Sequence, residues 1–343
     1  MKKSLFILII VYTFSISYQA EAFWVWSPKT KKLINPKYAA KDNPEEQYKW
    51  AMRFFKKKEY TRAAEEFSLL TTHFKDSDLA PEAQYYAGRS YEEAGKPYPA
   101  FVAYQKTIDV YPFTKRIDEI IEREYNLGRT LYKKHSGKLM GKELMTDLDR
   151  AAEIFKIVRE NAPFGVYADK AQFMLGQCHK KSEQYNEAIT AFQQLVDEYA
   201  KSNLAEKARY EVAQCTYLAS LKSDYDQELT DEAIEEFKKV AMSRSGGVLT
   251  EEAKEAVSLL ENKKAESLFK TAQFYEKQKH YKSAVIYYKE VLNRYPRSSS
   301  SKSAMENLGK IEMRFKQEAM TKESELDATM GVGKAKKPWI SFE

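Results

Sequence analysis

Hydrophobic and small residues recur along this chain at intervals of about 34 residues, and each interval holds two stretches with the spacing of an amphipathic helix. The clearest interval carries Gly88, Tyr91, Ala100, Tyr104 and Pro112. The glycine and the alanine let helix backbones approach closely, and the aromatic residues fill the gaps between them. The proline ends the second helix because it has no N–H to donate. This pattern predicts a helix-turn-helix unit.

The same offsets occur elsewhere in the chain. Three more intervals follow them closely, with the members Ala51, Phe54, Ala63 and Phe67; Gly176, His179, Ala188 and Phe192; and Ala272, Tyr275, Ala284, Tyr288 and Pro296. Two others have a longer connection between their helices, with the members Gly128, Leu131, Ala151, Phe155 and Pro163; and Ala213, Ala233 and Phe237. These offsets are typical of tetratricopeptide repeats, so the sequence predicts an all-α superhelical solenoid of about six such repeats and a C-terminal capping helix over residues 303–319.

Outside the repeats, the sequence predicts three further segments. Residues 1–22 have two lysines, an apolar stretch and a small-residue cleavage site, which predicts a signal peptide, with an uncleaved anchor as the alternative. Residues 23–43 are expected to be an extended N-terminal segment, residues 44–320 the solenoid, and residues 321–343 a disordered tail. Within the solenoid, Gly246 and Gly247 indicate a break, after which Thr250 is the expected N-cap of a further helix.

Composition excludes several classes of protein. The net charge of +6 comes from basic and acidic residues that are interleaved, without the basic block that a nucleic-acid groove needs. With 12 Gly and 10 Pro, the chain has no glycine-rich phosphate loop. The four histidines are far apart in sequence, and paired carboxylates such as Glu65 and Glu66 fall on predicted exposed helix faces. The chain is therefore expected to have no catalytic residues, no cofactor and no metal site.

Cys178 and Cys215 are the only cysteines. They occupy equivalent positions of neighbouring repeats, so both are expected in the core. Neighbouring helices in such a stack lie about 8 to 10 Å apart, which disfavours a disulfide. An oxidising compartment would allow one, so two thiols and one bridge both remain open.

A ladder of aromatic and basic residues lies next to the packing positions of the first repeats. It consists of Tyr48, Tyr85, Arg89, Tyr125 and Arg129. Tyrosine offers rigid amphipathic area and arginine offers forked donors, so the ladder suits an extended peptide or a terminal carboxylate in the groove. The alternative is that each tyrosine is half-buried packing of the repeat.

The stretch "ENKKAESLFKTAQFYEKQKHYKSAVIYYKEVLNRYPRSSSSKSA" is similar to a block in BamD/ComL-type outer-membrane assembly factors, and the resemblance extends over about residues 43–319. It implies a periplasmic scaffold at the inner face of the outer membrane that binds unfolded barrel substrates and the central barrel assembly protein. It also implies substrate contact at the ladder. Docking of the barrel protein would fall on Tyr275, Lys279, Tyr281 and Arg294.

One feature departs from that family. Its members usually carry a lipidated cysteine after the signal peptide, and no cysteine stands there in this chain. We therefore expect no N-terminal lipid anchor and peripheral membrane association through the partner, or through the "FWVW" at residues 23–26. The alternative function is a periplasmic repeat adaptor for envelope constriction or wall synthesis, of the Tol-Pal-associated type. No heptad repeat precedes the solenoid, which favours the assembly factor.

Overall fold

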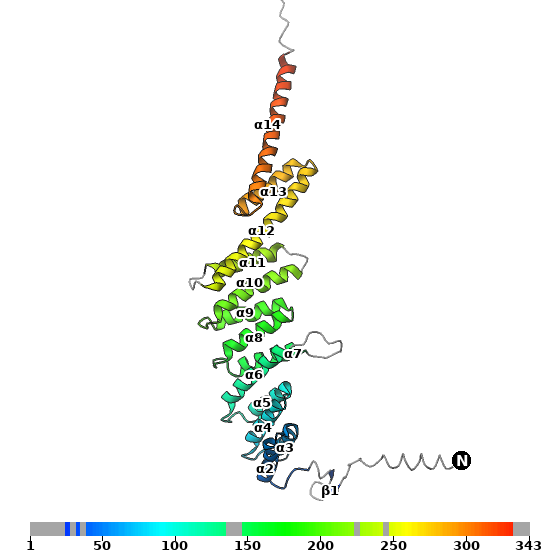
Figure 1. Cartoon of the computed structure of the whole chain (residues 1–343), viewed down its shortest axis with the longest axis vertical. Helices are drawn as coiled ribbons and strands as arrows, with labels where there is room; N and C mark the ends of the chain where they lie inside the picture. The colour runs from blue at the N-terminus through cyan, green and yellow to red at the C-terminus, as the bar shows by residue number, and fades with distance from the viewer. Residues whose placement is uncertain are drawn as a thin grey trace, which may run out of the picture. The chain divides into compact units, whose positions relative to one another are not determined.

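A computed structural model describes residues 25–27, 32–34, 39–134, 146–222, 227–242 and 247–331 of the chain. These residues form thirteen helices and one small two-stranded sheet (Figure 1). The helices follow one another as pairs, as the repeat pattern predicts. The all-α tetratricopeptide architecture is therefore confirmed.

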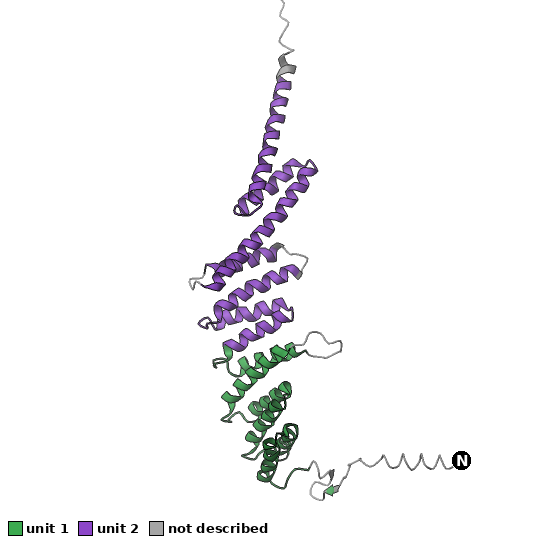
Figure 2. Cartoon of the chain, viewed as in Figure 1, with its two compact units in different colours: residues 1–168 green, residues 169–343 purple. Residues whose placement is uncertain are grey.

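The chain divides into two compact units, residues 1–168 and residues 169–343 (Figure 2). In unit 1, each helix packs against the next along the chain. Its helices are α2 (Pro44–Lys56), α3 (Tyr60–His73), α4 (Ala80–Glu93), α5 (Pro97–Val110), α6 (Ile117–Lys134) and α7 (Asp147–Asn161). They form three repeats, α2–α3, α4–α5 and α6–α7.

Unit 2 contains three more repeats and a final helix. Its helices are α8 (Ala168–Lys181), α9 (Tyr185–Glu198), α10 (Ala205–Lys222), α11 (Gln227–Ala241), α12 (Val248–Lys277), α13 (Tyr281–Arg294) and α14 (Ser301–Gly331). The core of its last repeat includes Ala272, Tyr288 and Val291, and α14 closes this core with Leu308 and Ile311.

In three repeats the small residue is a glycine that lies directly against the aromatic residue of the partner helix. A Cβ atom added to Gly88 would lie 2.5 Å from two ring atoms of Tyr104. At Gly176 the nearest atom would be on Phe192, at 2.6 Å, and at Gly128 on Phe155, at 2.9 Å. Real Cβ atoms do not approach carbon this closely, so these positions admit only the smallest residue unless the ring moves.

The turn inside the repeat also recurs. Lys58, Gly95, Glu183 and Lys279 all have φ between 59° and 69°, and each follows the first helix of its pair at the same repeat position. This left-handed conformation ends the first helix and starts the return. Only one of the four is glycine, so three repeats accept a less favourable side chain there.

The N-terminal segment contains a short hairpin. Strand β1 (Val25–Ser27) pairs antiparallel with β2 (Lys32–Ile34), with Val25 opposite Ile34. Trp26 is 56% exposed, and the side chains of the other "FWVW" residues lie outside the described part. The predicted signal peptide and most of the longer α6–α7 connection also lie outside the described residues.

The C-terminal helices correct three details of the prediction. Helix α14 continues to Gly331, so residues 321–331 are helical where a disordered tail was expected, and residues 332–343 lie outside the described part. Helix α12 is one continuous helix of 30 residues, so the helix expected after Gly247 and the first helix of the last repeat are the same element. Gly247 is its N-cap, whereas Thr250, the expected cap, is buried in the first turn.

The two cysteines are buried thiols and do not form a disulfide. Cys178 and Cys215 are 1% and 0% exposed. Burial raises the pKa of the Cys215 thiol to about 12, and the nearby Lys180 ammonium offsets only part of this shift. A thiol with so high a pKa is unreactive at neutral pH.

A buried polar contact links the helices of three repeats. The Nε2 atoms of Gln47, Gln84 and Gln172 donate to backbone carbonyls of the second helix, at 2.8, 3.0 and 2.7 Å. The same repeat position in α6 holds Glu124, which is fully buried. Both of its carboxyl oxygens accept from Nε2 of Gln105, at 2.8 Å. Burial raises the pKa of Glu124 to about 8, and Asp109 adds repulsion.

The packing of Gly88 predicts a contrast between two helical glycines. Ala at Gly88 should destabilise the protein by about 1–3 kcal/mol, because Tyr104 is fully buried and its hydroxyl is held by Glu92 at 2.6 Å. Ala at Gly309 meets nothing within 4 Å, so it should stabilise by about 0.5–1 kcal/mol through helix propensity. Urea unfolding of both variants measures this, and the same sign for both would contradict the packing constraint.

Glu124 predicts a pH-dependent stability. Its folded pKa lies above the unfolded value of about 4.3, so the folded state holds the proton more tightly. The contribution is complete below about pH 4.3 and is lost as pH rises through about 8. Thermal unfolding should therefore show a falling melting temperature from pH 6 to pH 9. Glu124→Gln, which restores the residue type of three other repeats, should remove that part of the fall; an unchanged slope would refute the assignment.

Candidate functional site

The described residues offer little for catalysis or metal binding. They hold no group of three or more His, Cys, Asp and Glu side chains that could bind a metal ion. His179 pairs its Nδ1 with Oε1 of Gln184 at 2.8 Å, and His280 is the N-cap residue of α13. In the described part of the chain, no helix has both the length and the apolar character to cross a membrane.

The ladder residues lie on the first helices of the unit 1 repeats, in α2, α4 and α6. Tyr48 is half-buried, with its ring edge-on to Phe67 at 5.6 Å and to Tyr86 at 6.2 Å. Burial, with repulsion from the Glu82 carboxylate, raises the pKa of Tyr48 above its usual range. The Tyr48 ring therefore packs against the core, and part of its surface remains exposed to solvent.

Tyr85 has no surface to offer a peptide. It is 1% exposed, and its hydroxyl donates to Oε1 of Glu119 at 2.5 Å. Arg89 donates to the same hydroxyl at 3.3 Å and to Glu93 at 3.2 Å. A direct contact between Tyr85 and a substrate peptide does not fit this burial, because the ring and the hydroxyl contact other residues of the protein. Arg89 is held by this hydrogen bond to Tyr85 and keeps only part of its guanidinium at the surface.

An ion-pair network joins α4 to α6, and it was missed by the sequence analysis. Arg116 donates twice to Glu82, at 2.7 and 3.2 Å, and once to Glu119 at 2.9 Å. Arg123 bridges Glu119 at 2.9 Å and Glu92 at 3.3 Å. The signal was present in the sequence, because Glu82 and Arg116 are 34 residues apart, one repeat length.

This network fixes the charge of Glu119. Partial burial would raise its pKa, but hydrogen bonds from Tyr85, Arg123 and Arg116 lower the pKa to about 2. The carboxylate is therefore ionised at any physiological pH. The face formed by α4 and α6 is held by matched charges, which leaves few of these arginines available to a partner.

Tyr125 and Arg129 form the most accessible part of the ladder. Arg129 is exposed, and its guanidinium carbon lies 5.9 Å from the centre of the Tyr125 ring. Tyr125 lies edge-on to Phe155 at 5.7 Å and stays half-buried. A peptide carboxylate or carbonyl could reach this guanidinium without displacing an ion pair of the α4–α6 network.

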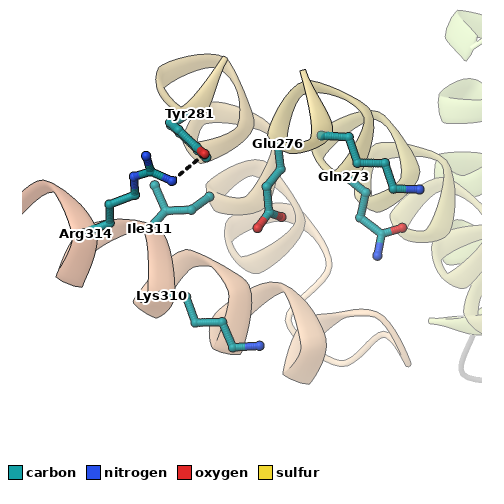
Figure 3. Close-up of a pocket in the computed structure, with 7 residues that line it drawn as sticks. Gln273, Glu276, Tyr281, Lys310, Ile311 and Arg314 are labelled. Carbon is teal, nitrogen blue, oxygen red and sulfur yellow. Dashed lines mark hydrogen bonds between the residues drawn. The ribbon is translucent and has the colours of Figure 1, made fainter. Parts of the chain in front are cut away.

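The last repeat and α14 line an open surface pocket of about 510 Å³ (Figure 3). We call it the C-terminal pocket; it is lined by Gln273, Glu276, Lys277, Tyr281, Lys310, Ile311 and Arg314. The Tyr281 hydroxyl accepts from Nη1 of Arg314 at 2.5 Å, and the guanidinium carbon lies 4.4 Å from the ring centre. Tyr281 is the one expected docking residue that lines this pocket.

The other three expected docking residues lie elsewhere in unit 2. Tyr275 stacks on Tyr287 at 5.4 Å, and Lys279 is the left-handed residue of the turn before α13. Arg294 pairs with Glu290 at 3.2 Å and with Asp231 of α11 at 3.3 Å. The sequence pattern missed Lys310 and Arg314, because α14 was interpreted only as a cap.

The charges of the C-terminal pocket favour an acidic partner segment. Lys277, Lys310 and Arg314 contribute three cations, and Glu276 contributes the only carboxylate among the lining residues. The Glu276 carboxylate already accepts a hydrogen bond from the Tyr288 hydroxyl, at 2.6 Å. Arg314 is paired with Glu318 at 2.9 Å, so a partner carboxylate would be attracted mainly by Lys277 and Lys310.

Two family models match the chain. The model of the YfiO family, described as an outer membrane lipoprotein, matches residues 128–326. A tetratricopeptide-repeat model matches residues 82–114. The first match covers more than half of the 343 residues and includes every lining residue of the C-terminal pocket. A comparison with curated proteins finds no match.

Among solved structures, two similar chains are bacterial. MamA (residue 41 to the end) from Desulfovibrio magneticus RS-1 has 20% identity and a TM-score of 0.30, with 59% of this chain and 95% of that chain covered. The C-terminal part of a repeat protein from Cytophaga hutchinsonii has 16% identity and a TM-score of 0.31, with 77% and 88% covered. Neither likeness bears on function.

Proposed function

Because the chain belongs to the YfiO family of outer membrane lipoproteins, we propose that it is a non-catalytic scaffold in the assembly of outer-membrane β-barrel proteins. It works in the periplasm, at the inner face of the outer membrane. Its partners are polypeptides, and it needs no cofactor. The observation that carries the proposal is the family match over residues 128–326, which contains the C-terminal pocket.

The C-terminal pocket is the proposed docking site for the central barrel protein. Its lining side chains come from three helices, α12, α13 and α14, that pack together around one core. The pocket is therefore preformed, which lowers the entropic cost of binding a folded domain. Tyr281 and Arg314 supply the kind of aromatic and guanidinium side chains that dominate binding energy at protein interfaces.

The ladder in unit 1 is the proposed site for unfolded substrates. Tyr48, Tyr125 and Arg129 keep exposed surface, and Arg89 adds part of a guanidinium. An extended C-terminal segment of a barrel protein offers carbonyl groups and a carboxylate to such a surface. Tyr85 is proposed here only as the support that positions Arg89.

Two variants test both sites, and each is the control for the other. Lys277→Ala with Arg314→Ala removes two cations from the C-terminal pocket and should weaken binding of the barrel protein's periplasmic domain by about tenfold or more. Its affinity for a barrel-protein C-terminal peptide should not change. Arg129→Ala should weaken binding of the peptide by about 1–3 kcal/mol and leave binding of the periplasmic domain unchanged. Calorimetric titration of the exported chain measures both affinities.

Two outcomes would contradict the proposal. Equal effects of both variants on both ligands would show that neither surface is a specific site. Recovery of Tol components or wall synthases from envelope extracts, in place of a large barrel protein, would favour the adaptor for envelope constriction.

A further inference from the structure

The turn that follows the second helix of a repeat has one geometry at five described places. In each, the N–H of the fourth residue donates to the carbonyl of the first, at 2.8 to 3.1 Å. The third residue of this turn projects outward, and the five residues there are Asp76, Phe113, Phe164, Lys201 and Arg297. Three of these are charged, as expected for the most exposed position of the repeat.

Phe113 and Phe164 depart from that expectation. They are 97% and 98% exposed, so each ring is surrounded almost wholly by solvent. Neighbouring turn residues add to the apolar surface, since Val166 is 77% exposed and Val110 is 50% exposed. We call these four residues the turn-edge patch. Exposed apolar patches often mark surfaces that bind a protein or a membrane.

The two turns lie at the same end of unit 1. The Tyr98 hydroxyl near the start of α5 donates to Glu153 in the middle of α7, at 2.9 Å. Gln105, seven residues further along α5, accepts from Asn161 at the end of α7, at 3.1 Å. The helices α5 and α7 are therefore parallel, and the turns that follow them lie on the same side of unit 1 in Figure 1.

The chemistry of the patch distinguishes a bilayer from a protein partner. Phe113 lines none of the described pockets, although its neighbours Thr114 and Lys115 line one of about 420 Å³ together with Glu82. Both rings project almost fully into solvent, whereas peptide sites are concave and enclose an anchor.

Residues 111–117 and 162–167 contain no carboxylate, and the exposed carboxylates that precede them are Asp109 and Glu160, at the ends of α5 and α7. Lys115 is exposed beside Phe113. Exposed apolar side chains beside a lysine suit the membrane interface, where the rings can enter the acyl-chain region and the ammonium can stay near anionic headgroups.

We propose that the turn-edge patch inserts into the interface of a phospholipid bilayer and holds unit 1 against the membrane surface. Phe113 and Phe164 enter the acyl boundary, and Lys115 stays at the headgroups. This contact requires neither the central barrel protein nor a lipid attached to the chain. It orients the ladder of α2, α4 and α6 relative to the bilayer.

The test uses the chain purified after export and vesicles of phosphatidylethanolamine and phosphatidylglycerol that contain no protein. Flotation should recover the wild-type chain with the vesicles. The double variant Phe113→Ser with Phe164→Ser should bind about tenfold less, since two apolar side chains leave the interface. Each single variant should show an intermediate loss. Circular dichroism of the double variant should equal that of the wild type, because neither ring contributes to the core.

Ile286→Ser is the matched control, because Ile286 is 64% exposed on α13 of unit 2 and is not a patch residue. It should bind vesicles as the wild type does. Equal binding by the double variant and the control would overturn the proposal, as would absence of wild-type binding to any vesicle. Because the vesicles hold no barrel protein, these outcomes are independent of the proposed function. Loss of barrel-protein binding in the double variant, with vesicle binding intact, would instead assign the patch to a protein interface.

Discussion

The contact between a glycine and an aromatic ring, seen in three repeats, is the constraint on which the structure depends. Gly88 against Tyr104, Gly128 against Phe155 and Gly176 against Phe192 leave no room for a Cβ atom. This contact sets how closely the two helices of a repeat approach. It thereby fixes which side chains of the first helix are buried and which remain exposed.

The binding surfaces follow from that packing. In unit 1 the repeat length brings Glu82 to Arg116 and Tyr85 to Glu119, so that matched charges hold the α4–α6 face. Arg129 lies outside these pairs and is exposed, which is why it is proposed for substrate contact. In unit 2, α14 packs on α13 and extends past the last repeat, and the cations that it contributes make the C-terminal pocket positive.

Periodicity predicted the helix pairs and the packing positions, because these depend on local spacing and on residue size. It did not predict which polar residues pair between helices. Tyr85 was a candidate for peptide contact, with packing as the alternative; it is buried, and its hydroxyl donates to Glu119 one repeat away. Arg294 looked like a docking residue, yet it pairs with Asp231, 63 residues earlier. Such pairings depend on tertiary distances that one repeat's pattern does not contain.

The central claim is that this preformed helical surface binds the outer-membrane barrel assembly protein at the C-terminal pocket. Its most direct test is a photo-crosslinking amino acid placed at Tyr281 in living cells, with Leu259, which is 66% exposed on α12, as the reference position. Mass spectrometry of the adducts identifies the partner. We expect a large outer-membrane barrel protein attached at position 281 and little at position 259. Adducts with a wall synthase or a Tol component, or equal adducts at both positions, would contradict it.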